Sequence, residues 1–393
     1  MNRLLAIVLC VACLDGMLAI AAGTGADYFV YVGSYTDAPS SAKGIYAWRF
    51  APATGSVTSI GLVAETVNPA YVYATPDRRF LYATNWQTAD AAKGDTMSAY
   101  AINIKTGALT FLNKVSSGGG LPNEVVVDPR GKIAAVTNFG FHDFDAEHNN
   151  SSFAALPIQP DGRLGAPFFV DHYSAAALSP RQTTGAHTHG VVFTKDDRFA
   201  FVAELGLDRV YTYRVDPAKP AMVPFDPPFV SVTAGAGPRR LVLSPSDTFL
   251  YVNHQDDSKV SVFAVDGGHL KEIQQLSTLP ADFGGRNTTA EIQIDKAGRF
   301  LYVSNRGADS IAVYAIDPAK GTLTLREFVP ALGKSPRNIT IDPTGQYLFA
   351  ANQNSDNIVL FKVNSETGHL TPTGQPLHMG QPGSVLFVNA GTD

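Results

Sequence analysis

The stretch EIQIDKAGRFLYVSNRGADSIAVYAID, residues Glu291–Asp317, decides the fold. Apolar and polar residues alternate on both sides of DKAG, which is typical of two β-strands joined by a tight turn. A second turn at RGAD leads to a third strand, SIAVYAID, and PAKGT then leads to a fourth. The stretch therefore predicts an antiparallel sheet of four short strands. It also places an arginine, Arg306, where the second strand ends.

The hairpin at the start of this unit recurs along the chain at intervals of roughly 50 residues. The six copies are PAYVYATPDRRFLYATN, PNEVVVDPRGKIAAVTN, THGVVFTKDDRFAFVAE, PRRLVLSPSDTFLYVNH, TAEIQIDKAGRFLYVSN and PRNITIDPTGQYLFAAN, and they end at Asn85, Asn138, Glu204, His254, Asn305 and Asn352. Four short strands in each repeat of this length are typical of a β-propeller blade.

The two ends of the chain supply a seventh unit. FVYVGSYT, near the N-terminus, resembles the second half of a hairpin, and PGSVLFV, from Pro382 to Val388, resembles the missing first half. Pairing of these strands would close a ring and leave few free strand edges. We therefore predict an all-β, seven-bladed propeller over residues 27–393. Two β-sandwiches are the alternative, but the regular spacing and the split ends disfavour it.

Residues 1–26 have the pattern of a secretory signal peptide, with an early arginine, an apolar run and small residues near Ala21. Asp15 and Gly16 interrupt the run, which argues against a stable membrane span. A lipid on Cys13 or an uncleaved anchor are the alternatives. We expect a periplasmic or extracellular protein whose mature chain, lacking Cys10 and Cys13, has neither a disulfide nor a thiolate metal site.

Net charge is −5, so no basic field points to nucleic acid. Serine-elbow, P-loop, haem-attachment and HExxH motifs do not occur in the sequence. We expect no cofactor, and we expect a monomer.

Polar residues recur at the open ends of the hairpins. Counted from the first residue of the second strand, the position ten before it is occupied in turn by Ala70, Asn123, His189, Arg239, Ala290, Arg337 and Gly383. The position six after it is occupied by Tyr35, Trp86, Phe139, Leu205, Gln255, Arg306 and Gln353, and the position five after by Ser34, Asn85, Asn138, Glu204, His254, Asn305 and Asn352. We expect the first two positions to be cross-strand neighbours and all three to face one mouth of the channel.

These residue types fit a definite chemistry. Arginines bind carboxylate or phosphate oxygens, and a neutral histidine can act as a general base. An enzyme that acts on an anionic sugar lactone would use both. Alternatively, the polar residues only solvate the channel. A third possibility is a zinc or calcium site at His187, His189 and Glu204, although we favour no metal. The acidic insertion at 141–152 is interpreted as a solvated loop or a lid over the mouth.

Several stretches resemble the lactonase family of seven-bladed propellers, which contains propeller-type bacterial 6-phosphogluconolactonases and fungal 3-carboxy-cis,cis-muconate cyclases. They are VYVGSYT, HGVVFTKDDRFAFVAELGLDRVYTYRVD, GAGPRRLVLSPSDTFLYV, EIQIDKAGRFLYVSNRGADSIAVYAID and SPRNITIDPTGQYLFAANQNSDNIVLFKVN. The resemblance implies a site with a histidine at His189 and arginines at Arg239 and Arg306. It also implies a glutamate where this chain has Gln255, which cannot act as an acid or base.

The resulting hypothesis is an exported lactonase with His189, Arg239 and Arg306 as catalytic residues. Substrate-binding roles are expected for Gln255, Glu204, Asn138, His187, Glu291 and Arg337. The ligand would be a small, anionic lactone. The alternatives are a non-catalytic propeller that binds a carbohydrate or a protein, which the change to Gln255 favours, and a muconate-type cycloisomerase.

Overall fold

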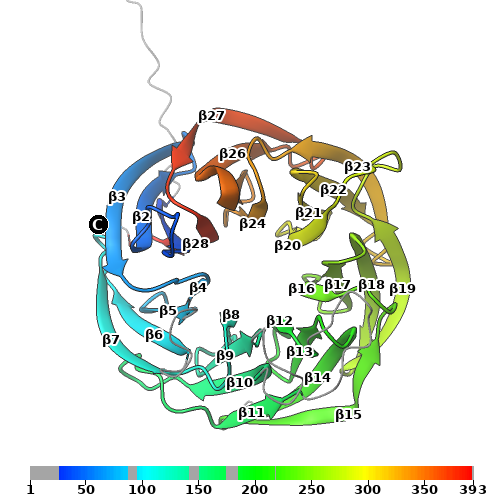
Figure 1. Cartoon of the computed structure of the whole chain (residues 1–393), viewed down its shortest axis with the longest axis horizontal. Helices are drawn as coiled ribbons and strands as arrows, with labels where there is room; N and C mark the ends of the chain where they lie inside the picture. Colours follow the sequence, from blue (N-terminus) through cyan, green and yellow to red (C-terminus); the bar gives the residue numbers. More distant parts are fainter. Residues whose placement is uncertain (1–25, 87–94, 141–149, 174–184, 217, 392–393) are drawn as a thin grey trace, which may run out of the picture.

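A computed structural model describes residues 26–86, 95–140, 150–173, 185–216 and 218–391. These residues form seven four-stranded antiparallel sheets arranged as blades around a central channel (Figure 1). Within the described ranges, the single helical element is a 3-10 turn, Gln353–Ser355. The predicted seven-bladed propeller is therefore confirmed.

Each blade is given from the channel outward. Blade 1 contains β28 (Pro382–Asn389), β1 (Tyr28–Ser34), β2 (Gly44–Ala51) and β3 (Ser56–Glu65). Blade 2 contains β4 (Val72–Ala74), β5 (Phe80–Asn85), β6 (Thr96–Ile102) and β7 (Leu109–Ser116). Blade 3 contains β8 (Pro122–Val127), β9 (Ile133–Asn138), β10 (Ser152–Pro157) and β11 (Phe169–His172).

The remaining blades follow the same order. Blade 4 contains β12 (Thr188–Phe193), β13 (Phe199–Glu204), β14 (Arg209–Asp216) and β15 (Ala221–Ser231). Blade 5 contains β16 (Pro238–Leu243), β17 (Phe249–His254), β18 (Lys259–Asp266) and β19 (His269–Ser277). Blade 6 contains β20 (Thr288–Ile294), β21 (Phe300–Arg306), β22 (Ser310–Ile316) and β23 (Leu323–Pro330), and blade 7 contains β24 (Pro336–Ile341), β25 (Tyr347–Asn352), β26 (Asn357–Val363) and β27 (Leu370–His378).

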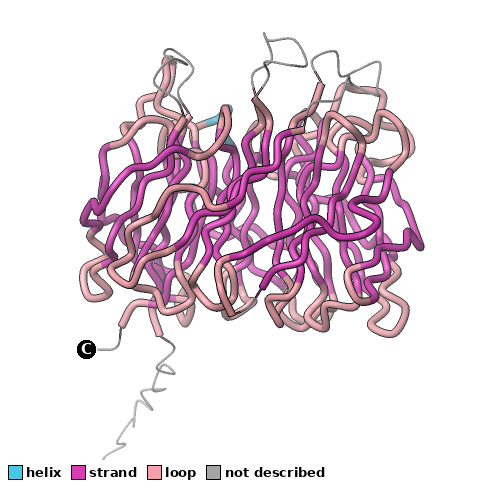
Figure 2. The backbone as a smooth tube through the Cα atoms, turned by 90° about the horizontal axis from the view of Figure 1, so that it is seen from below, coloured by secondary structure: helices cyan, strands magenta, loops and turns pink. Residues whose placement is uncertain are grey.

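The ring closes in blade 1, where β28 from the C-terminal end pairs with β1 from the N-terminal end. The pairing runs from Tyr28 opposite Asn389 to Ser34 opposite Pro382, and Figure 1 shows the red and blue strands side by side. The backbone N–H of Ala390 also donates to the carbonyl of Asp27 (2.9 Å). The predicted closure is confirmed, and the C-terminus leaves the ring at the face with the hairpin turns, opposite the open hairpin ends (Figure 2).

The hydrophobic core lies between the blades. The buried apolar residues that the structure describes form seven clusters, each drawn mainly from two adjacent blades. Between blades 7 and 1, for example, the ring of Phe50 packs edge-on against Phe349, with ring centroids 5.1 Å apart. Alternation along each strand supplies both faces of a blade with apolar side chains, so every blade contributes to two clusters.

The inner hairpins contain an irregularity that the sequence did not reveal. In six of the seven blades the inner strand has a β-bulge close to its open end. In blade 5, Pro238 pairs with His254 and Arg240 with Asn253, so Arg239 is the extra, unpaired residue. A bulge redirects side chains and is common next to active sites.

The predicted cross-strand pairing at the open ends was therefore wrong by two residues. Arg306 pairs with Thr288 rather than with Ala290, and the position ten before the second strand is the bulged residue in most blades. Among the described residues, no helix is long and apolar enough to cross a membrane. The predicted signal peptide lies almost wholly outside the described residues.

Candidate active site

A small polar pocket opens at the end of the channel where the bulges lie. Its volume is about 200 Å³. It is lined by Trp86, Asn123, Phe139, His189, Arg239, Gln255, Arg306 and Arg337. All eight come from the two predicted positions, ten before and six after the start of the second strand. The three residues expected to be catalytic therefore lie in one pocket.

His189 is the bulged residue of β12 and is almost completely buried. Its backbone carbonyl accepts hydrogen bonds from Nδ2 of Asn123 (2.9 Å) and Oγ1 of Thr137 (3.0 Å), which fix the bulge. The edge of the imidazole packs against the ring of Phe139, with centroids 5.8 Å apart. Nδ1 is buried and has no hydrogen-bond partner among the described residues. Among the described residues, the imidazole is thus held by the bulged backbone and an aromatic contact, and no carboxylate bonds to its Nδ1.

Two arginines share the side chain of Gln255. Its Oε1 accepts hydrogen bonds from Nε of Arg239 (3.2 Å) and from Nη2 of Arg306 (3.0 Å). Each guanidinium is also held by a backbone carbonyl, Arg239 by Ala290 and Arg306 by Thr289 (3.1 Å). Gln255 therefore positions both arginines without neutralising either one.

The third arginine of the pocket, Arg337, contacts an aromatic ring. The guanidinium of Arg337 lies 5.0 Å from the ring centroid of Tyr35, in a cation–π contact. Tyr35 packs edge-on against Trp86 (5.4 Å), whose Nε1 donates to the carbonyl of Pro122 (2.5 Å). Blades 1 to 3 thus supply aromatic rings, and blades 5 to 7 supply guanidinium groups.

The electrostatics of the pocket favour binding of an anion. Burial, followed by the charge of Arg337, lowers the pKa of Arg306 to about 9. Burial and the neighbouring Arg306 and Arg337 likewise hold the pKa of Arg239 well below its usual range. Arginine keeps its proton in proteins, so these shifts express first the burial of the guanidinium groups and then their mutual repulsion, and a bound anion would relieve the repulsion.

The same charges act on the histidine. Burial lowers the pKa of His189 well below its usual value, and Arg239 and Arg240 lower it further. His189 is therefore neutral at physiological pH, the form that can accept a proton.

A charged layer lies directly below the pocket, on the residues that follow the bulges. Arg240 forms ion pairs with Glu124 and, at 3.8 Å, with Glu291. Its guanidinium lies 4.5 Å from the ring centroid of Tyr71, and Oε2 of Glu291 accepts a hydrogen bond from Asn338 (2.9 Å). The three charged side chains are buried, so breaking one ion pair would leave an uncompensated buried charge.

Two residues of this layer differ from the sequence-based expectation: Glu291 was expected in the pocket, and Arg240 was not expected at the site. Glu291, expected to bind substrate, lies in the ion-pair layer and does not line the pocket. Arg240 follows Arg239 directly, and alternation would point it away from the channel. The bulge instead directs both residues inward. The two consecutive arginines in the sequence PRRLVL were the feature from which Arg240 could have been predicted.

Glu204 and Asn138, two more expected substrate-binding residues, lie outside the pocket lining. The carboxylate of Glu204 accepts hydrogen bonds from the backbone N–H groups of His187 and Leu207, and burial raises its pKa to about 7. Asn138 donates through Nδ2 to the carbonyl of Ser117 (3.1 Å), just after the outer strand of the preceding blade. Both side chains therefore fasten crossovers between blades.

The same role recurs at the position five after the start of the second strand. Asn85, Asn305 and Asn352 donate to the carbonyls of residues that follow the outer strands of the preceding blades, Val67, Thr278 and Ala331. The expectation that this position faces the mouth was wrong. Successive residues of a strand point to opposite sides, so the residue five after is buried when the residue six after lines the pocket.

His187, also an expected substrate-binding residue, stacks on Phe139 with ring centroids 4.4 Å apart, and its Nδ1 is 2.9 Å from the carbonyl of Phe139. His187 therefore supports Phe139, one of the aromatic rings that line the pocket. In the part of the chain that the structure describes, no three His, Cys, Asp or Glu side chains gather as they would around a metal ion. The proposed zinc or calcium set is not assembled, because Glu204 faces backbone amides. Residues 141–149, most of the proposed lid, lie outside the described residues.

The model of a family described as "Lactonase, 7-bladed beta-propeller" matches residues 29–387. A solved structure titled as a periplasmic gluconolactonase of Pseudomonas aeruginosa has a TM-score of 0.85 and 32% identity, and covers 93% of this chain and 100% of its own.

Two curated relatives carry the name 6-phosphogluconolactonase. The protein from Bacillus subtilis is 31% identical over 79% of this chain and 84% of its own length. The protein from Formosa agariphila is 28% identical over 79% of this chain and 85% of its own length.

Proposed function

The chain belongs to the lactonase family of seven-bladed β-propellers, and we propose that it hydrolyses the ester bond of a sugar-derived lactone in the channel pocket. One observation carries the proposal: the pocket combines a neutral, buried histidine with three arginines and an aromatic side. The relatives named as gluconolactonase and 6-phosphogluconolactonase support the same substrate class.

In the proposed reaction, water attacks the lactone carbonyl carbon while His189 takes a proton from it. The carbonyl oxygen becomes an oxyanion beside Arg239 and Arg306, whose donors are held in place before the reaction begins. The positive charges of the arginines would destabilise a protonated His189. The negative charge of the oxyanion offsets this repulsion, so the proton transfer and the formation of the oxyanion are coupled. The ring C–O bond then breaks, and His189 returns the proton to the leaving ring oxygen.

The product of this reaction is an open-chain hydroxy acid, and its carboxylate carries the charge that the arginines favour. The aromatic rings of Trp86 and Phe139 would pack against the apolar face of the sugar ring. Gln255 would act as a positioning residue, because its Oε1 contacts both arginines and it cannot exchange a proton.

We also propose that the protein is exported. The support is the signal-peptide pattern of residues 1–26 and the periplasmic gluconolactonase among the similar structures. Cleavage would be checked by N-terminal sequencing of the protein recovered from the periplasm or medium. An unphosphorylated aldono-lactone suits that compartment better than a phosphorylated intermediate of central metabolism.

The test of the function is hydrolysis followed by pH-stat, with gluconolactone, 6-phosphogluconolactone and a carboxymuconolactone, each corrected for spontaneous opening. Arg306→Ala should reduce kcat by about 100-fold, the loss typical of one oxyanion donor. Arg326→Ala, which removes an exposed arginine on β23, is the matched control and should leave kcat unchanged. No turnover of any lactone by the wild-type protein would overturn the proposal and favour a binding propeller.

A further inference from the structure

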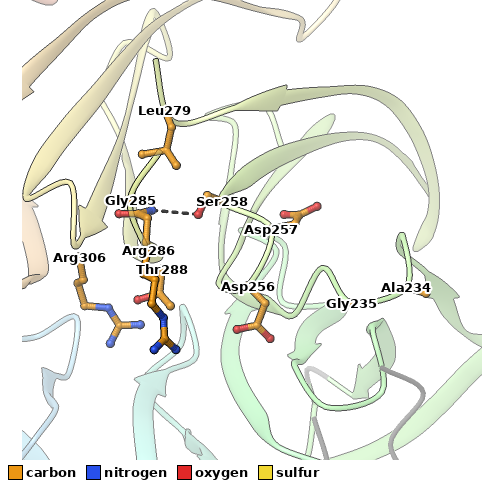
Figure 3. Close-up of a pocket in the computed structure, with 11 residues that line it drawn as sticks. Ala234, Gly235, Asp256, Asp257, Ser258, Leu279, Gly285, Arg286, Thr288 and Arg306 are labelled. Carbon is orange, nitrogen blue, oxygen red and sulfur yellow. Dashed lines mark hydrogen bonds between the residues drawn. The ribbon is translucent and has the colours of Figure 1, made fainter. Parts of the chain in front are cut away.

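A second and larger cavity adjoins the pocket above blades 5 and 6. Its volume is about 1190 Å³ (Figure 3). It is lined by Ala234, Gly235, Asp256, Asp257, Ser258, Leu279, Gly285, Arg286, Asn287, Thr288 and Arg306. We call this cavity the blade 5–6 groove. Arg306 lines both spaces, so it marks their junction. A ligand in the pocket could therefore extend past Arg306 into the groove.

The lining of the groove mixes donors and acceptors. Figure 3 shows the guanidinium groups of Arg306 and Arg286 and the carboxylate of Asp256 in a row along one side. Ser258, Asn287 and Thr288 add hydroxyl and amide groups, and Leu279 is the one large apolar side chain in the lining set. Hydroxyl groups of a sugar can satisfy donors and acceptors together, whereas an apolar ligand would leave them unpaired.

A phosphate fits this lining less well than a sugar. The carboxylate of Asp256 lies on the same side of the groove as the two arginines and would repel a dianion. The guanidinium of Arg286 is exposed and forms no ion pair among the described residues. It is therefore available to hydroxyl oxygens of a ligand.

The base of the groove is held in place by its own contacts. Nδ2 of Asn287 donates to Oγ of Ser258 (2.9 Å), and its Oδ1 accepts from the backbone N–H of Ala308 (3.1 Å). Oδ1 of Asp257 is 3.2 Å from Nδ1 of His254, and its Oδ2 is 3.4 Å from Nζ of Lys259. Polar groups fixed in this way lower the entropic cost of recognising a ligand.

We propose that the blade 5–6 groove binds a glycosyl substituent, so that the substrate class is an aldono-lactone carrying at least one further sugar unit. This inference rests on the proposed function, because the lactone ring is assigned to the pocket. The difference between the two volumes supports it: the pocket has room for one small ring, and the groove for the remainder of a disaccharide or trisaccharide lactone.

The test compares gluconolactone with cellobiono-1,5-lactone and maltobiono-1,5-lactone by pH-stat, using the full mature protein. At least one disaccharide lactone should have a kcat/KM about tenfold above that of gluconolactone. Arg286→Ala should remove most of this preference by raising KM, while kcat for gluconolactone stays within twofold. Arg326→Ala again serves as the control for loss of an exposed arginine.

Equal kcat/KM values for gluconolactone and both disaccharide lactones would overturn the inference and leave the lactonase function intact. A preference for 6-phosphogluconolactone that depends on Arg286 would also overturn it, by assigning the groove to phosphate. If no lactone were hydrolysed, calorimetric titration with cellobionate would decide separately: binding weakened by Arg286→Ala would support the glycosyl site, and absence of binding would contradict it.

Discussion

At the scale of single residues, the pocket depends on which charges are left uncompensated. Gln255 stands between Arg239 and Arg306 and accepts a hydrogen bond from each, so both keep their full positive charge. Directly below, Arg240 is paired with Glu124 and Glu291. Positive charge is therefore retained in the pocket and compensated beneath it.

The lowered pKa of His189 leads to a pH prediction. A general base works in its neutral form, so activity should stay level as pH falls from 7.5 to 6 and decline only below the ordinary histidine range. Gluconolactone hydrolysis measured between pH 5 and 7.5 should follow this course. His189→Asn should lose at least 100-fold in kcat while its thermal unfolding stays close to that of the wild type. A rate that halves near pH 6.5 in the wild-type protein would contradict the assignment.

Gln255→Glu tests the charge of the pocket. A carboxylate at this position would pair with both arginines and remove one positive charge. We expect KM for 6-phosphogluconolactone to rise about tenfold, with KM for neutral gluconolactone changed less than twofold. Gln255→Leu is the companion variant that removes the hydrogen bonds and adds no charge. A large increase in kcat for Gln255→Glu would instead show that a glutamate here takes part in proton transfer.

At the scale of elements, the inner hairpins serve two ends of the molecule. Their bulged ends aim side chains at the pocket, and their turns build the opposite face. There, the turns of blades 3 and 4 bring together two buried carboxylates, Asp128 and Asp197. Burial, followed by the charge of Asp128, raises the pKa of Asp197 to about 7. Oδ2 of Asp128 and Oδ1 of Asp197 are buried without a hydrogen-bond partner among the described residues.

Asp197→Asn should therefore stabilise the protein at high pH. Since the folded-state pKa is raised, the native protein holds its proton more tightly than the unfolded chain, and that contribution is lost as pH rises through about 7. The asparagine amide can donate to Asp128 at any pH, and it tolerates the left-handed backbone at this position (φ 59°). Urea unfolding should show a gain of about 1 kcal/mol at pH 8 and none at pH 5. An equal difference at both values would exclude a shared proton.

At the scale of the whole molecule, the ring is held by blade 1, in which the two ends of the chain meet. Without β28, the inner edge of β1 would be unpaired, and the clusters on both sides of blade 1 would lose Val385 and Val388. Each blade packs on two neighbours, so one open blade weakens the entire circle.

Removal of residues 382–393 should therefore abolish a cooperative unfolding transition. The matched control is a circular permutant that joins residue 391 to residue 26 through a short linker and opens the chain at the exposed turn between β22 and β23. It keeps every strand pair, so it should fold and retain lactonase activity. Calorimetry of both proteins makes the comparison. Cooperative unfolding of the truncated chain would refute the role given to ring closure.

The sequence alone determined the architecture and the positions of the pocket residues. A strand period of two, turns at fixed offsets and a repeat of about 50 residues leave few folds other than a propeller. Equivalent positions in each repeat must also point to the same end of the channel. His189, Arg239, Arg306 and Arg337 occupy such equivalent positions, and they line one pocket.

Tertiary structure alone decided which neighbours of those residues face the channel. The bulges turn Arg240 and Glu124 inward beside their pocket neighbours, while Glu204 and Asn138 point between blades to hold crossovers. A bulge adds one residue near the end of the strand and breaks the alternation over only one or two positions, which is too few to give a signal in sequence periodicity. The groove beside the pocket is likewise formed by loops from two blades, whose proximity depends on the closed ring.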